Sequence, residues 1–113
     1  MANEFANAQK VGVTTVQTVY TAAAGKTCIM LELDIANTTS SVVEASVQML
    51  DKSVNANYAT GGRHIVKNAP VPAGGSLMVI AGQKIVLEAT DIIKVTSTGA
   101  TDVVAAILED VNS

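Results

Sequence analysis

The chain has 113 residues, which fits one domain with a core able to bury roughly two-thirds of the unfolded surface. Its 49% hydrophobic content is mainly aliphatic, and aromatic residues make up only 3%, which argues against a deep, aromatic-lined ligand pocket. Seven Lys and Arg against ten Asp and Glu give a net charge of −3 without any basic run, so we expect no nucleic-acid partner.

The single cysteine, Cys28, excludes an intrachain disulfide and indicates a reducing compartment. Its apolar neighbours predict a buried small hydrophobe and not a reactive thiol. The first ten residues do not have the pattern of a signal peptide, and apolar runs such as Leu77 to Ala81 are too short to cross a bilayer. We therefore expect a soluble protein made in the cytoplasm, with no membrane partner.

Residues 1–10 show no periodicity and are predicted to form an extended arm, either free in solution or ordered by a neighbouring subunit. The domain itself is predicted to span residues 11–113. Val11 to Tyr20 is rich in Thr and Val and is predicted to be its first strand.

Strict alternation of apolar and polar residues begins at Cys28 and continues to Ala36. It predicts a strand with Glu32 and Asp34 in solvent and four side chains in the core, namely Ile29, Leu31, Leu33 and Ile35. The next segment repeats the pattern, with four residues facing inwards: Val43, Ala45, Val47 and Met49. The turn-forming residues 37–40 lie between them, so we predict an antiparallel hairpin.

The segment from Asp51 to Gly62 is polar and is predicted to be a loop, with a short edge strand around Tyr58. Arg63 to Lys67 is a short strand candidate. Residues 68–75 contain two prolines, which lack a backbone donor, so this segment is predicted to be an extended crossover between sheets.

Three short strands are predicted next, at residues 76–80, 83–88 and 91–97. Residues 102–111 fit both an apolar helical stripe and a strand buried on both faces, and the preceding β segments favour the strand. Seven or eight short strands with turns between them predict an all-β chain: one antiparallel β-sandwich or jelly-roll-like domain.

Few residues of the sequence could support catalysis or bind a metal ion. His64 is the only histidine, and the chain has no Gly-x-Ser-x-Gly elbow and no zinc-ligand spacing. The Gly61–His64 segment offers amides for an anion, but we interpret it as a loop entering a strand. Three acidic pairs do not form a calcium loop: Glu32 with Asp34, Glu88 with Asp91, and Glu109 with Asp110. We predict no catalytic residue, cofactor or metal ion, and hence no enzyme.

The stretch from Val66 to Leu77, with its Ala-Pro-Val-Pro-Ala-Gly core, and the following stretch from Gly82 to Asp91 resemble small β-sandwich virion proteins of tailed bacteriophages. Those proteins carry similar "K-x-A-P-I-P-A-G-S-S-L" and "K-x-V-L-x-x-G-D" stretches. Tyr20-Thr21-Ala22-Ala23 and Leu33-Asp34-Ile35-Ala36-Asn37 also look like the opening strand and "L-x-x-A-N" turn of that family. The chain has Thr90 where the family more often has glycine.

The resemblance implies a non-enzymatic virion protein, and a head decoration or cement protein is the leading interpretation. Such a protein would stabilise contacts between subunits of the major capsid protein, its partner, as a trimer. Neck, tail or baseplate attachment is the alternative, and a carbohydrate-binding adhesion module is a third. Exposure and residue type suggest interface residues at Phe5, Lys10, Tyr58 and Arg63.

Overall fold

The computed structural model describes residues 3–51 and 62–111. Within these ranges the chain forms eight β-strands: β1 (Glu4–Val13), β2 (Gln17–Thr21), β3 (Cys28–Asn37), β4 (Val43–Leu50), β5 (Arg63–Val71), β6 (Ser76–Leu87), β7 (Ile92–Ser97) and β8 (Thr101–Glu109). The predicted C-terminal strand is confirmed as β8. In this part of the chain, no helix has the length and apolar character needed to cross a membrane.

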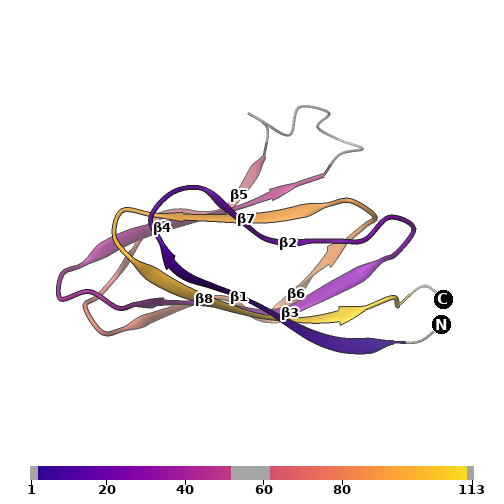
Figure 1. Cartoon of the computed structure of the whole chain (residues 1–113), viewed down its shortest axis with the longest axis horizontal. Helices are drawn as coiled ribbons and strands as arrows, with labels where there is room; N and C mark the ends of the chain where they lie inside the picture. Colours follow the sequence, from indigo (N-terminus) through magenta and orange to yellow (C-terminus); the bar gives the residue numbers. More distant parts are fainter. Residues whose placement is uncertain (1–2, 52–61, 112–113) are drawn as a thin grey trace.

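The strands form two four-stranded antiparallel sheets that lie one above the other (Figure 1). Sheet A has the order β1-β8-β3-β6, and sheet B has the order β2-β7-β4-β5. Pairs are nested along the chain, because β1 pairs with β8, β2 with β7, β3 with β6, and β4 with β5. This nested pairing is the topology of a jelly roll, so the predicted fold class is confirmed.

The core lies between the sheets and is made of Val, Leu, Ile, Met and Ala side chains. The largest fully buried side chains of this core come from both sheets: Met30, Leu33, Ile35, Ile80, Leu87, Ile93 and Ile107. Cys28 is only 1% exposed and belongs to this core, as the sequence predicted. Mainly aliphatic side chains thus fill the space between the sheets, which explains how a chain so poor in aromatic residues has a packed interior.

The structure corrects the prediction of an N-terminal arm. From Glu4 onwards it is not an arm but the edge strand β1, with Phe5 opposite Leu108 and Lys10 opposite Val103. The inward positions hold alanines, Ala6 and Ala8, which are half-buried. Because alanine gives a weak hydrophobic signal, the alternation in this strand escaped detection from the sequence.

The predicted hairpin is also wrong. β3 belongs to sheet A and β4 belongs to sheet B, so the connection at residues 38–42 crosses between the layers. Alternation predicted two half-buried strands, which is correct, but it carries no information about the partner of each strand. Asn37 holds the crossing in place through hydrogen bonds to the carbonyls of Ser41 and Val71.

A β-bulge divides β3. Met30 lies opposite Ile107 and Glu32 lies opposite Ala106, so the intervening Leu31 is an extra residue without a partner on β8. An extra residue moves the subsequent side chains to the other face. Ile29 and Leu31 therefore leave the core positions predicted for them, and Cys28 and Met30 occupy those positions.

Two further boundaries differ from the prediction. β5 extends to Val71 and includes Pro70, which a sheet tolerates because β5 is the edge strand of sheet B. The crossover between sheets is limited to residues 72–75. β6 is one strand where two were predicted, and positive φ angles at Gly82 and Lys84 mark the bulge that interrupts it.

Candidate functional site

The predicted interface residues do not form one site. Phe5 and Lys10 lie on β1, at one edge of sheet A, and Phe5 is 79% exposed. Arg63 is exposed at the start of β5, which is an edge strand of the other sheet, sheet B. Tyr58 and most of its predicted loop fall outside the described residues. Of the three residues that the structure describes, Phe5 is the one that lies on a larger surface feature.

That feature is the outward face of sheet A. Residues directly opposite one another in an antiparallel sheet share a face, so the register assigns the outward rows. One row crosses all four strands and is entirely apolar: Phe5, Leu108, Ile29 and Val86. A second row contains two exposed apolar side chains, and consists of Gln9, Val104, Asp34 and Met78.

A third row lies between these two and consists of Asn7, Ala106, Glu32 and Ala81. We call the three rows together the A face. None of the described segments lies across it, since sheet B covers the opposite side of sheet A (Figure 1). The A face is therefore a mostly apolar surface with two carboxylates at its centre.

The outward face of sheet B has a different composition. One of its rows runs through Thr18, Lys94, Gln48 and His64, and another pairs Ser46 with Thr96. Polar outward positions are what a solvated sheet face requires, because only its inward positions are buried. His64, the only histidine of the chain, lies on this polar face in an exposed position.

Glu32 and Asp34 are the two acidic residues of the A face. The Asp34 side chain raises the pKa of Glu32 above its usual range, because protonated Glu32 forms a hydrogen bond with Asp34 and because their negative charges repel. The Oδ1 atom of Asp34 is buried and has no hydrogen-bond partner among the described residues. The sequence had placed both acids on one strand face, and the structure confirms that placement.

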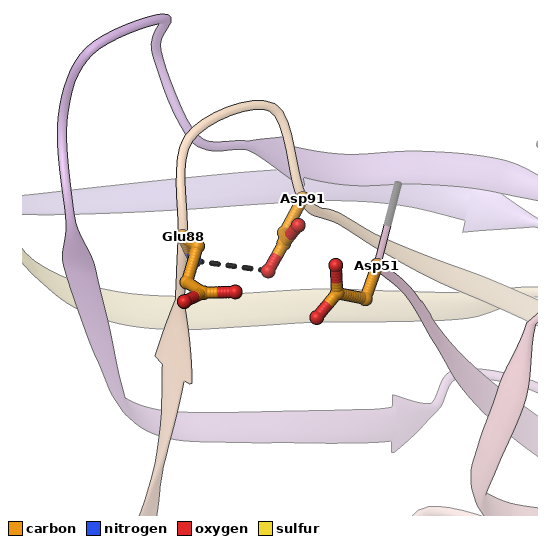
Figure 2. A group of neighbouring side chains, drawn as sticks. All are labelled: Asp51, Glu88 and Asp91. Atoms are coloured by element: carbon orange, nitrogen blue, oxygen red, sulfur yellow. Dashed lines mark hydrogen bonds between the residues drawn. The ribbon is translucent and has the colours of Figure 1, made fainter. Parts of the chain in front are cut away.

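A second acidic group lies at one end of the sandwich, where Asp51, Glu88 and Asp91 point towards one another (Figure 2). One carboxylate oxygen from each residue lies within 4.8 Å of the others. Carboxylate oxygens are ligands for Ca²⁺ and Mg²⁺, but calcium takes six to eight oxygens, more than these three residues provide. Asp51 directly follows β4, far along the chain from the other two, so no sequence signal groups it with them.

Asp91 also has a structural role. Its Oδ2 accepts a hydrogen bond of 2.9 Å from the backbone N–H of Glu88, and its own N–H donates to the Glu88 carbonyl at 3.0 Å. The two bonds close the turn between β6 and β7. Asp91 is 1% exposed, so the side chain belongs to the turn as much as to the acidic group.

A small pocket of about 130 Å³ lies near the two chain ends, lined by Glu4, Tyr20, Ala23, Lys26, Cys28, Glu109 and Asp110. The Tyr20 hydroxyl donates a hydrogen bond to the Glu109 carboxylate and lies 3.5 Å from Cys28 Sγ. Burial, together with the bonds to Cys28 and Glu109, raises the pKa of Tyr20 well above its usual value. The neutral phenol thus joins β2 of sheet B to β8 of sheet A.

The same pocket contains an ion pair between Lys26 Nζ and Asp110 Oδ2, at 3.2 Å. Lys26 is largely exposed, so the pair adds little to stability. The volume is well below the several hundred cubic ångströms of a typical small-molecule site. Sequence analysis had noted the adjacent acids Glu109 and Asp110 but not the tyrosine and lysine that they contact.

Known protein-family models do not match the chain, and neither does any curated protein sequence. One solved structure, "Structure of infectious bursal disease virus Gt strain", is similar at 11% sequence identity and a TM-score of 0.44. The match covers 96% of this chain but 30% of that one, so this chain spans less than a third of its length. The similarity is too low to assign this chain a family or a function.

Proposed function

We propose that this chain is a non-enzymatic virion protein: a capsid decoration or cement protein that stabilises contacts between major-capsid subunits. The single observation that carries the proposal is the Ala-Pro-Val-Pro-Ala-Gly segment, Ala69 to Gly74, which resembles small virion proteins of tailed bacteriophages. In the structure the first half of the segment lies in β5, and the second half connects the sheets, leaving sheet B at Val71 and joining sheet A at Ser76.

The crossover is also well formed locally. The Gly75 N–H donates to the Pro72 carbonyl at 2.9 Å, and the Asn37 N–H donates to the Gly75 carbonyl at the same distance. A turn that pairs with β3 in this way fixes where β6 begins. The resemblance therefore involves a segment that organises both sheets, and the jelly roll that it organises is an architecture used in viral capsids.

The surfaces support an assembly role. The A face presents contiguous apolar side chains, as interaction surfaces do, and the pocket beside Tyr20 and Glu109 is too small for most metabolites. A protein of this kind works through contacts with other proteins. We propose that these contacts are made in the virion after synthesis in the host cytoplasm, with the chain assembled as a trimer.

Copy number in purified particles tests the location. We expect hundreds of copies per particle, measured by quantitative mass spectrometry against the major capsid protein, because decoration follows the repeating capsid lattice. A few dozen copies or fewer would place the chain in the neck, tail or baseplate. Binding on a glycan array, without attachment to particles, would instead support the adhesion module.

Attachment in vitro provides the second test. The purified chain should sediment as a trimer in analytical ultracentrifugation and should co-sediment with empty capsids that lack it. Heat-induced release of capsid subunits should then shift to higher temperature, because a ligand that binds only the assembled state stabilises that state. A monomer that stays in the supernatant would contradict the decoration role.

A further inference from the structure

The two outward faces of this sandwich differ in a way that its fold does not require. An antiparallel sheet that packs on one side usually alternates apolar-in and polar-out, and most of sheet B follows this rule. The exception is the outward pair Leu50 and Ile92, of which Leu50 is buried. Sheet A breaks the rule, because four large apolar side chains of the A face are exposed to solvent: Phe5 (79%), Met78 (67%), Val86 (56%) and Val104 (49%). They come from three different strands and meet only through the register of the sheet.

The exposed apolar residues surround a centre of negative charge. Glu32 and Asp34 lie on β3, between the outward residues of β8 and those of β6. The buried Oδ1 atom of Asp34 has no hydrogen-bond partner among the described residues, which is an unfavourable state for a carboxylate. Because Oδ1 is itself inaccessible from outside, a cation brought by another molecule would form an ion pair with exposed Glu32, whose negative charge adjoins that of Asp34. Apolar surroundings would strengthen that ion pair, because water is excluded from them.

We propose that the A face is a docking surface for another protein, whose contact surface is apolar and carries a Lys or Arg opposite Glu32 and Asp34. The identity of this partner as a major-capsid subunit rests on the proposed function. The three rows span about five residues along strands spaced about 4.8 Å apart, which gives a flat footprint of roughly 320 Å². A standard protein interface buries about 800 Å² on each side, so the A face would form the apolar centre of a larger contact.

A second copy of this chain fits the A face less well. Across the three described rows, the outward residues include two acids but no Lys or Arg. Packing of two A faces would therefore bury the apolar side chains while leaving both acidic pairs without a cation. Charge complementarity thus selects a different protein as the occupant, and contacts within a trimer would use other surfaces.

Oxidation of methionine measures whether the face is covered. Hydrogen peroxide transfers one oxygen atom to the Met78 sulfur, which forms the sulfoxide, and leaves water. In the free chain, exposed Met78 should react readily, whereas fully buried Met30 should resist and serves as the internal control. In particles that carry the chain, we expect Met78 to react at least tenfold more slowly, read by peptide mass spectrometry.

The outcomes separate the two proposals. A chain that is present in particles but whose Met78 reacts as fast as in the free protein would overturn the docking face and leave the virion role standing. A chain that does not attach to particles would overturn the virion role, and with it the partner named here. Protection of Met78 in purified, particle-free trimers would show that a second copy covers the face, which also overturns the proposal.

Substitutions identify the residues that matter. Met78→Lys places a charge on the A face, while Val42→Lys places one at a similarly exposed position, 63% against 67%, in the β3–β4 connection. Val86→Lys and Val16→Lys form a second matched pair, at 56% and 57% exposure. All four side chains are exposed, so the variants should fold, as checked by circular dichroism. We expect the A-face variants to attach at least tenfold more weakly, with the controls unchanged.

The acidic centre is tested separately. A Glu32→Gln, Asp34→Asn double variant keeps the shape of both side chains and removes their charge. We expect its attachment to weaken several-fold and to lose most of its dependence on salt, because salt screens the ion pair that the wild type forms. Attachment by the double variant with unchanged affinity and unchanged salt dependence would overturn the cationic partner.

Discussion

At the scale of single residues, Asn37 shows how one polar side chain fixes a connection between two sheets. It is 2% exposed, and its Nδ2 donates to the carbonyls of Ser41 and Val71 at 2.7 and 2.9 Å. Its Oδ1 accepts from the N–H and the hydroxyl of Thr39, at 2.9 and 2.7 Å. All polar atoms of the side chain are therefore satisfied, which makes their burial possible.

Removal of this side chain should be costly. We expect Asn37→Ala to lower the free energy of unfolding by about 3 kcal/mol, because it leaves buried donors and acceptors without partners. Asn37→Asp should cost a similar amount, since a carboxylate repels the two carbonyls to which the amide donates. Urea denaturation at neutral pH measures both. Asn7→Ala, at an exposed position of β1, is the control and should change stability by less than about 0.5 kcal/mol.

The acidic pair of β3 predicts a dependence of stability on pH. The pKa of Glu32 is raised in the folded state, so protonated Glu32 adds stability that is fully present below its unfolded pKa of about 4.5. That contribution is lost as the pH rises through the folded pKa. Glu32→Gln imitates the protonated form, so we expect it to be more stable than the wild type at pH 7. The difference should shrink as the pH falls towards 4.

Thermal unfolding across this pH range provides the measurement. Glu44→Gln, which removes an exposed carboxylate from β4, is the matched control for the loss of one negative charge. Equal stabilisation by both substitutions at pH 7 would indicate a general charge effect and contradict the specific interaction between Glu32 and Asp34.

At the scale of elements, the turn between β6 and β7 carries an unfavourable backbone angle. Thr90 has a φ of 70°, in a region where a β-branched residue is rarely found. It occupies the third position of a turn closed by the Asp91 N–H and the Glu88 carbonyl, where type II turns prefer glycine. The turn forms here without glycine because the Asp91 side chain holds it from the other side.

Thr90→Gly should therefore stabilise the protein, by about 1 kcal/mol, and Thr90→Ala should gain less because it keeps the Cβ atom. Gly25 is the converse control: its φ is 76° and an added Cβ would meet nothing within 4 Å. Gly25→Ala should cost about 1 kcal/mol through the backbone alone. A Thr90→Gly variant that unfolds at a lower denaturant concentration would contradict the strain at this turn.

The same elements show how far the sequence could be interpreted. The alternation around Leu33 and Ile35 correctly predicted a half-buried strand, because side chains in a strand point to alternate faces. The bulge at Leu31 was not predictable, since it depends on the strands that lie on either side of β3. The predicted pairing of β3 with β4 was wrong for a similar reason. Residues 37–40 have the composition of a hairpin turn, yet Asn37 bonds to β5 and directs the chain to the other sheet.

The candidate docking surface was predictable only in part. Glu32 and Asp34 share a strand, so their common face followed from spacing alone. Phe5, Val86 and Met78 come from β1 and β6, and they join that face only through strand pairing over long sequence separations. The aromatic character of Phe5 predicts an interface residue, but the sequence predicts an arm where the structure has the strand β1.

At the scale of the whole molecule, the nested pairing makes nearly every strand contact distant in sequence. β1 pairs with β8, and β2 pairs with β7, so the ends of the chain must meet before these ladders form. Loop closure of this length carries an entropic cost ahead of any favourable contact. We expect refolding to take roughly milliseconds to seconds, measured by stopped-flow circular dichroism after dilution from urea. Refolding within microseconds would contradict this expectation.

The position of β8 has a consequence for synthesis. β8 lies between β1 and β3 and joins them into one sheet, yet of the eight described strands it leaves the ribosome last. Until then β1, which carries Phe5, has no partner in sheet A, whereas β3 and β6 can already pair with each other. A chain terminated before β8 would therefore present only part of the A face to its partner. The order of the strands would in this way favour the assembly of chains that have been translated through β8.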